Sequence, residues 1–325
     1  MREQGAAFFF LRHFIGAERL YEAMLLPTQR CNLRCRHCNA RTEPRPELSA
    51  AVWRRTLTDL QRCGTMQVTF SGGEPLLRPD LPALLRHADG LGLALTLFSN
   101  GQLLDRARVA ALRGLRWREI TLSLYSVRAH EHDRLTRHPG SWVKTAAALA
   151  RLADAGLPVA VNCMTLRGLR PAAQNEVFQW ASGRGYRCHT GSMLLPVLDG
   201  DLAPLRLRRI VAVADAPRVG AKAWRRGCGC GEAATMINAY GDCYPCSFFP
   251  APLGNVCVQT VSAIRRQSPL LPVIRRGLDR IALRRSCRQC RQRVGCRQCF
   301  GQAFLETGTC YRPAAASCAQ FGRSS

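Results

Sequence analysis

The chain has 325 residues, 47% of them hydrophobic, so it is long enough to bury a large core and is not a disordered polypeptide. The formal net charge is +25, but lysine occurs only at Lys144 and Lys222 and the arginines are spread along the chain, which makes a nucleic-acid surface an unlikely use of the charge. A basic groove that binds an acidic peptide or cofactor is kept as an alternative use of the charge. Seventeen clustered cysteines indicate metal binding rather than a disulfide framework.

Residues 1–23 are expected to be an N-terminal extension. Their short apolar run at residues 8–10 is broken by Arg12 and His13, so we predict neither a signal peptide nor a membrane span. A cytoplasmic protein with reduced thiols follows from this prediction. Reduced thiols favour ligation of an iron–sulfur cluster or zinc over disulfide bonds.

From residue 24 to residue 204, short β-type runs alternate with amphipathic helical runs, the pattern of parallel strands joined by crossover helices. Strands are expected at residues 24–27, 67–71, 93–98, 119–124, 159–164 and 186–193. Helices are expected at residues 50–63, 81–91, 105–112, 143–155 and 172–182. Ser49 and Asp105 are expected to cap helix N-termini, and Gly92, Gly114 and Gly156 to end helices. The predicted class is α/β.

Cys31, Cys35 and Cys38 follow the first expected strand directly, with three and then two residues between them. Three thiolates can hold three irons of a cubane [4Fe-4S] cluster and leave the fourth iron open for chemistry. A pure electron carrier would close all four corners with cysteine, and a structural zinc ion would also need a fourth ligand. The position after a strand places the triplet at the carboxyl end of a parallel sheet, where such folds carry their active sites.

Gly72-Gly73-Glu74-Pro75 follows the second expected strand. Two glycines allow the backbone to approach a ligand closely, and Glu74 adds negative charge. Together with the cysteine triplet, this turn resembles the radical S-adenosylmethionine (SAM) superfamily over roughly residues 25–195. The resemblance implies a partial (β/α)6 TIM-type barrel whose cluster binds the amino and carboxylate groups of SAM. One electron then cleaves SAM to a 5'-deoxyadenosyl radical, and the three cysteines are the catalytic cluster ligands.

Further polar residues stand at the expected strand ends. Ser99 and Asn100 follow the third strand, Ser123 closes the fourth, and Asn162 lies on the fifth. The resemblance makes all four candidate cofactor contacts, with Ser123 and Asn162 holding the ribose or carboxylate of SAM. The alternative is that each is a satisfied polar residue at a strand end.

After Pro204 the alternation fades, and residues 205–325 are expected to form a small cysteine-rich α+β domain. Its cysteine spacing resembles the SPASM or twitch extension, which carries one or two auxiliary [4Fe-4S] clusters, except that two residues separate the last pair where three are usual. The resemblance implies one cluster held by Cys287, Cys290, Cys296 and Cys318. It implies another held by Cys228, Cys230, Cys246 and Cys299, with Cys243 competing for a place in this set and Cys310 for that of Cys318. Cys63, Cys163, Cys188 and Cys257 are expected to be buried apolar thiols.

Residues 123–141 and 296–318 resemble radical enzymes that mature ribosomal peptides, including the pyrroloquinoline quinone type. The resemblance implies an oxidoreductase that forms bonds in, or oxidises, a peptide or peptide-derived substrate. His130 and His132 lie in the first region and are better explained as ordinary surface residues than as catalytic ones. Expected partners are a precursor peptide, a flavodoxin- or ferredoxin-type reductant and, because only 23 residues precede the first strand, a separate leader-recognition protein.

Two alternatives stand beside this prediction. One is a zinc-stabilised basic module that binds nucleic acid without catalysis, because paired Cys-x2-Cys knuckles are also typical of zinc ribbons. The other, within the enzyme class, is radical SAM modification of a non-peptide cofactor precursor such as a tetrapyrrole.

Overall fold

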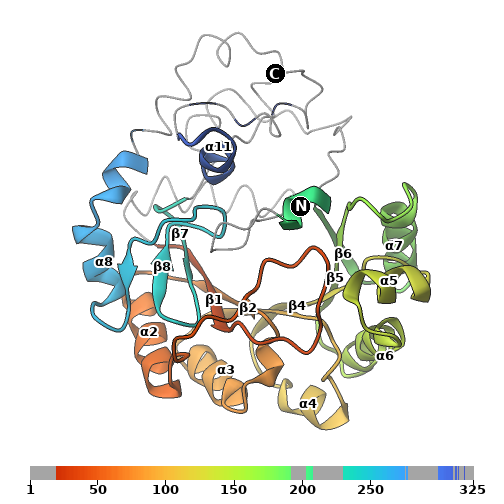
Figure 1. Cartoon of the computed structure of the whole chain (residues 1–325). Coiled ribbons are helices and arrows are strands. Elements are labelled where there is room, and N and C mark those ends of the chain that lie inside the picture. Colours follow the sequence, from red (N-terminus) through yellow and green to blue (C-terminus); the bar gives the residue numbers. More distant parts are fainter. Residues whose placement is uncertain are drawn as a thin grey trace, which may run out of the picture.

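The computed structural model describes residues 20–191, 203–207, 230–274, 276, 299–309, 312, 314 and 318 (Figure 1). Nine strands form one sheet in the order β6-β5-β4-β3-β2-β1-β7-β8-β9. The first six strands run parallel in sequence order, which confirms the predicted partial barrel. They are β1 (Glu22–Thr28), β2 (Gln67–Gly72), β3 (Ala94–Ser99), β4 (Trp117–Ser123), β5 (Val159–Met164) and β6 (Arg187–Gly191).

Helices cover the outer side of the strands, as Figure 1 shows. They are α2 (Ala50–Arg62), α3 (Leu81–Gly90), α4 (Arg106–Ala111), α5 (Ala129–Thr136), α6 (Ser141–Asp154) and α7 (Ala173–Ser182). One face of the sheet is apolar and buried beneath them, with Leu25, Phe70 and Leu97 paired in register and fully inaccessible. Burying each such side chain contributes about 1.5–3 kcal/mol. The next residues along the strands point to the opposite face, and there the register aligns Thr69, Thr96 and Glu119.

The five expected helices are confirmed, with ends shifted by no more than two residues. The Ser49 hydroxyl accepts a hydrogen bond from Val52 N at 3.4 Å, and the Asp105 carboxylate accepts one from Arg108 N at 2.8 Å, so both predicted N-caps are present. Gly92, Gly114 and Gly156 have positive φ angles just beyond their helices. Of the sixth expected strand, residues 192 and 193 lie outside the described residues.

Helix α5 is absent from the sequence prediction. Its buried face consists of Glu131, His132, Leu135 and Thr136. Hydrophobic periodicity cannot reveal a helix whose buried side is mostly polar. The helix depends instead on tertiary partners for these side chains.

The C-terminal module continues the barrel sheet. Strand β7 (Ala234–Ile237) pairs in parallel with β1, and β8 (Asp242–Tyr244) and β9 (Gly254–Asn255) follow in antiparallel order. Its described helices are α8 (Val261–Gln267) and α11 (Phe300–Thr307). Two short 3-10 helices lie elsewhere in the chain, η1 (Pro75–Leu77) after β2 and η2 (Ala203–Leu207) after β6. Cys243, Phe249 and Ile264 share one hydrophobic cluster with barrel residues. The predicted boundary at residues 204/205 is therefore bridged by a common sheet and a common core.

Among the described helices, none has the length and hydrophobicity required to cross a bilayer.

Candidate cofactor site at the carboxyl end of the sheet

The three cysteines of the triplet lie in the loop that follows β1, where the sequence places them. The end of α5 anchors this loop, because Arg34 N donates to Thr136 O at 3.3 Å and Arg36 N donates to Leu135 O at 2.9 Å. The unexpected helix thus positions the cysteine loop. Cys31 is exposed, whereas Cys35 and Cys38 are half-buried.

Burial is the main reason that the thiol pKa values in this loop are raised. The pKa of Cys31 rises to about 11, and those of Cys35 and Cys38 are raised as well. For Cys31 and Cys35, the charges of the neighbouring cysteines add to the effect. At neutral pH these thiols stay protonated unless a cation binds, and bound iron supplies the positive charge that stabilises thiolates.

In the described parts of the chain, no three His, Cys, Asp or Glu side chains are arranged around a single metal ion. A cubane cluster does not need such convergence, because each thiolate binds a different iron. The three thiols therefore suit a cluster by their chemistry and by their shared loop.

The turn after β2 lies directly against the start of the cysteine loop. Gly73 N donates to Thr28 O at 2.9 Å, and Glu74 N donates to Arg30 O at 2.8 Å. A Cβ on Gly73 would lie 2.2 Å from Arg30 O. Gly72 has a φ of +120°, and a Cβ there would clash with Thr28 O at 2.4 Å. Only glycine fits at either position, so the two predicted elements are joined by backbone contact.

Glu74 is fully buried and ties the end of β2 to the end of β3. Its Oε1 accepts from Ser99 Oγ at 2.9 Å and from Leu76 N at 3.1 Å, while Oε2 accepts from Asn100 N at 2.8 Å. Burial raises the pKa of Glu74 to about 7, although these hydrogen bonds work in the opposite direction. Both oxygens accept hydrogen bonds from protein groups, so the carboxylate could act on a cationic ligand through its charge but not by direct contact.

Asn100 reaches from the end of β3 to the cysteine loop. Its Nδ2 lies 2.7 Å from Asn32 Oδ1 and 3.7 Å from Cys31 Sγ. Ser99, by contrast, is buried, donating to Glu74 and accepting from Gly101 N at 3.0 Å. Of these two candidate cofactor contacts, Asn100 is the one whose side chain contacts the cluster loop.

Ser123 and Asn162 are paired in register on β4 and β5, and both are half-buried. They lie on the strand face opposite the fully buried Leu122 and Val161. The structure thus brings these two candidate residues side by side on neighbouring strands. A role for them in holding ribose or carboxylate stays a prediction.

The same register row continues to His189 on β6, which sequence reasoning missed. His189 Nε2 lies 2.9 Å from Glu119 Oε2, and Arg187 contacts the same oxygen at 3.3 Å. Burial works to raise the pKa of Glu119, but the hydrogen bond from His189 and the charges of His189, Arg187 and Arg118 leave it below its ordinary value. Polar residues at alternate positions of strands 117–123 and 187–191 were the available signal.

This arrangement has a defined chemical capacity. An ionised carboxylate at Nε2 favours the tautomer with the proton on that nitrogen, which leaves the Nδ1 lone pair free to accept a proton. The imidazole is about half exposed, with 48% of its side-chain surface accessible. Glu119 and His189 therefore form an oriented acid–base pair on the polar face of the barrel.

Tyr125 joins His37 of the cysteine loop to His132 of α5, a contact that sequence reasoning did not predict. His37 Nε2 lies 3.1 Å from the Tyr125 hydroxyl, and the His132 ring stacks on Tyr125 with centroids 5.5 Å apart. Burial lowers the pKa of both histidines to about 4. His132 is thus a buried neutral residue, contrary to a surface position, whereas His130 is exposed.

The structure describes five of the candidate ligands of the C-terminal module. Cys230 Sγ and Cys246 Sγ lie 3.5 Å apart, so two members of one expected set meet. Cys243 is completely buried in the core, 3.3 Å from Thr235 Oγ1, and burial raises its pKa to about 11. Cys299 caps α11 by accepting from Gln302 N, and Cys318 is half-buried. Outside the described residues lie Cys228, Cys287, Cys290, Cys296 and Cys310.

The four cysteines expected to be buried apolar thiols behave differently. Cys163 is fully buried, as expected. Cys63 and Cys188 are only half-buried, and Cys257 is exposed, so the prediction is wrong for Cys257. Cys257 follows the end of β9 in a turn, where its backbone N donates to Asn255 Oδ1 at 2.8 Å and its side chain is left outside the core.

Two family models match the chain. The Radical SAM superfamily model matches residues 25–198, and an iron–sulfur cluster-binding domain model, SPASM, matches residues 228–291. Among curated proteins, an AdoMet-dependent heme synthase of Methanosarcina barkeri is 25% identical over 86% of this chain and 91% of its own length. A PqqA peptide cyclase of Rhodopseudomonas palustris is 36% identical over 43% of this chain, and the match spans only 38% of that protein.

Solved structures share the fold. SuiB of Streptococcus suis bound to S-adenosylmethionine has a TM-score of 0.72 at 18% identity, covering 97% of this chain and 81% of its own. The structure of anSMEcpe with bound AdoMet has a TM-score of 0.67 at 14% identity, covering 93% of this chain and 94% of its own. The Radical SAM model matches more than half of the chain, and with the SPASM match it implies [4Fe-4S] clusters and S-adenosylmethionine as cofactors. The chain belongs to the radical SAM superfamily and carries a C-terminal SPASM domain.

Proposed function

We propose that this radical SAM enzyme cleaves SAM to a 5'-deoxyadenosyl radical and uses it to modify a peptide or peptide-derived substrate. The observation that carries the proposal is the contact between the glycine turn and the cysteine loop, where Glu74 N donates to Arg30 O at 2.8 Å and a Cβ on Gly73 would lie 2.2 Å from the same oxygen. A bound cluster supplies the electron that breaks the carbon–sulfur bond of SAM.

Different residues of the chain would bind the cluster, SAM and the substrate. Cys31, Cys35 and Cys38 would each bind one iron through sulfur, and the backbone of Gly72-Gly73 would hold the methionine part of SAM. The oriented pair of Glu119 and His189 would accept a proton from substrate on the same polar face that carries Ser123 and Asn162. The buried apolar surface on the other side of the strands keeps this frame rigid.

Support for a peptide substrate comes from a partial sequence match. A stretch covering 43% of this chain is 36% identical to a PqqA peptide cyclase, although it spans less than half of that protein. The precursor peptide, a separate leader-recognition protein and a flavodoxin- or ferredoxin-type reductant follow as proposals. The family match favours this enzyme over a zinc-stabilised nucleic-acid module.

A tetrapyrrole-type cofactor precursor is the second candidate substrate. The heme synthase similarity favours it, because that match runs through both domains and covers 86% of the chain. The net charge of +25 would also suit a substrate with several carboxylates.

The test begins with anaerobic reconstitution of the full chain with iron and sulfide. Dithionite and SAM are added, and 5'-deoxyadenosine is quantified by mass spectrometry. Wild-type protein should form it, Cys35→Ala should not, and Cys257→Ser, which changes an exposed thiol, should match wild type. A colourless zinc protein, or product formation that persists in Cys35→Ala, would refute the proposal.

The substrate class is tested in the same assay with two additions. One is the set of short peptides encoded beside the gene, and the other is a propionate-bearing porphyrin precursor. The correct class increases 5'-deoxyadenosine formation and changes mass itself. An increase with the porphyrin alone would replace the peptide proposal with the second candidate.

A further inference from the structure

The amide of Asn100 has a defined orientation beside the cluster loop. Its Oδ1 accepts a hydrogen bond from Gln102 N at 2.9 Å, so the oxygen end of the amide is already used. Its Nδ2 therefore faces two acceptors, Asn32 Oδ1 at 2.7 Å and Cys31 Sγ at 3.7 Å. If the amide were flipped, its NH2 group would face Gln102 N and its oxygen would face Asn32 Oδ1, so two donors and two acceptors would oppose each other.

The backbone of Asn100 is held from two sides. Asn100 N donates to the buried carboxylate of Glu74 at 2.8 Å, and Asn100 O accepts from Thr145 Oγ1 of α6 at 2.9 Å. Gln102 Nε2 also donates to Thr145 Oγ1 at 2.9 Å. The Asn100 side chain is thus placed by the turn after β2 and by a helix, rather than by the loop that it contacts.

The three cysteine sulfurs differ in the donors around them. Cys31 Sγ receives Leu33 N at 3.4 Å as well as the Asn100 amide, and Cys38 Sγ receives Ala40 N at 3.4 Å. The Cys35 thiol receives a hydrogen bond from its own backbone N–H. Cys31 is the one sulfur of the three whose donor comes from a different strand of the barrel.

We infer that Asn100 is a positioning residue that orients Cys31 and raises the reduction potential of the SAM-binding cluster, and that Glu74 acts on the cluster through Asn100. An N–H donor withdraws electron density from a thiolate ligand, which stabilises the more negative, reduced cluster. The glycine turn would then have two roles, because the turn proposed to bind SAM also fixes, through Glu74, the donor at Cys31. The inference rests on the proposed function, since it requires the cluster in that loop.

The experiment is a redox titration of the anaerobically reconstituted full-length enzyme followed by electron paramagnetic resonance. The SAM-binding cluster is distinguished from auxiliary clusters by the change in its signal when SAM is added. Asn100→Ala removes the donor without adding charge, and Asn100→Asp keeps the shape and the oxygen but replaces the donor end. Asn175→Asp on the exposed side of α7 is the matched control.

Both Asn100 variants should shift the SAM-responsive signal to lower potential. Glu74→Gln replaces one carboxylate oxygen with an NH2 group that cannot accept, so the hydrogen bond from Asn100 N or those from Ser99 Oγ and Leu76 N are lost. A downward shift in Glu74→Gln supports the path through Asn100, whereas an upward shift would show that the carboxylate acts by its charge and would overturn that part of the inference. The control should keep the wild-type potential. An unchanged potential in Asn100→Ala with full iron content overturns the inference, as does a shift confined to Asn100→Asp, which would reflect charge alone. Failure of wild-type protein to form 5'-deoxyadenosine would instead refute the proposed function.

Discussion

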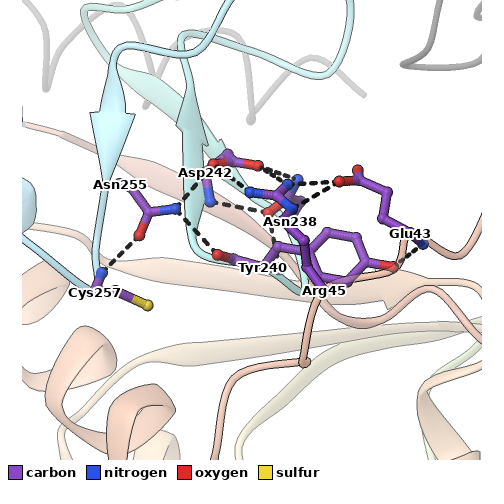
Figure 2. Close-up of polar contacts among 7 residues, drawn as sticks. All are labelled: Glu43, Arg45, Asn238, Tyr240, Asp242, Asn255 and Cys257. Atoms are coloured by element: carbon purple, nitrogen blue, oxygen red, sulfur yellow. Dashed lines mark hydrogen bonds and ion pairs between the residues drawn. The ribbon is translucent and has the colours of Figure 1, made fainter.

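Arg45 and Asp242 form an ion pair, with Nη2 and Oδ2 2.5 Å apart, that joins the loop after the cysteine triplet to the C-terminal module (Figure 2). The Arg45 guanidinium also lies over the Tyr240 ring, 4.7 Å from its centroid. Figure 2 shows that Asn238 and Asn255 also donate to the Asp242 carboxylate, Asn238 to Oδ2 and Asn255 to Oδ1. The loop that carries Cys31, Cys35 and Cys38 is therefore tied to the strands of the C-terminal module.

The first prediction concerns this ion pair. Arg45→Met keeps the aliphatic stem but leaves the Asp242 carboxylate, which is mostly buried, without its cation. We expect a loss of about 1–2 kcal/mol in the free energy of unfolding, since a hydrogen bond to a charged group is worth somewhat more than a neutral one. Urea unfolding of the reconstituted protein measures it. Arg108→Met, which removes an exposed pair with Asp105, should leave the urea midpoint unchanged.

The second prediction concerns pH. The pKa values of His37 and His132 are lowered to about 4 from 6.5, so between these values the unfolded chain binds protons that the folded chain excludes. Stability is thus complete above pH 6.5 and falls as the pH drops towards 4, by at most about 1.4 kcal/mol per pH unit for each histidine. His132→Phe should reduce this slope by up to one proton. His130→Phe, on the exposed face of α5, should leave the slope unchanged.

The third prediction concerns the tautomer of His189. Because Nε2 faces the Glu119 carboxylate at 2.9 Å, nitrogen-15 chemical shifts of histidine-labelled protein should report the proton on Nε2. Glu119→Leu removes the acceptor, so both tautomers should become populated. His138, whose Nδ1 lies 3.0 Å from Pro139 O, is an internal reference that should not respond. A His189 signal that is the same in both proteins would contradict the orienting role of Glu119.

The fourth prediction concerns the glycine turn. In Gly73→Ala the new Cβ would meet Arg30 O at 2.2 Å, so the turn and the cysteine loop must separate. We expect 5'-deoxyadenosine formation to fall at least about tenfold, because a shift near 1 Å in such a site readily costs this much. Gly90→Ala in α3 meets nothing within 4 Å and should retain activity, with stability raised by about 0.5–1 kcal/mol. Equal rates in the two variants would refute the placement of the turn.

The barrel was predictable because its signals are local. Strand β5 begins and ends at the predicted residues, and Ser49 and Asp105 cap their helices, since burial on one face and N-cap chemistry are written into a few neighbouring positions. The spacing of Cys31, Cys35 and Cys38 likewise indicated their chemistry. In each case the residues that matter stand within a few positions of one another.

Other features needed the tertiary structure. Helix α5 buries polar side chains, Cys257 lies outside the core, and Glu119 meets His189 from a strand 70 residues away. No local pattern encodes these contacts, because they arise from strand register and from the order of strands in the sheet. The sequence by itself determined the alternation of strands and helices and pointed to the three cysteines proposed to bind the SAM cluster. Only the folded chain decided that Glu74 reaches Cys31 through Asn100, since that path crosses three strand ends that meet only when the sheet is assembled.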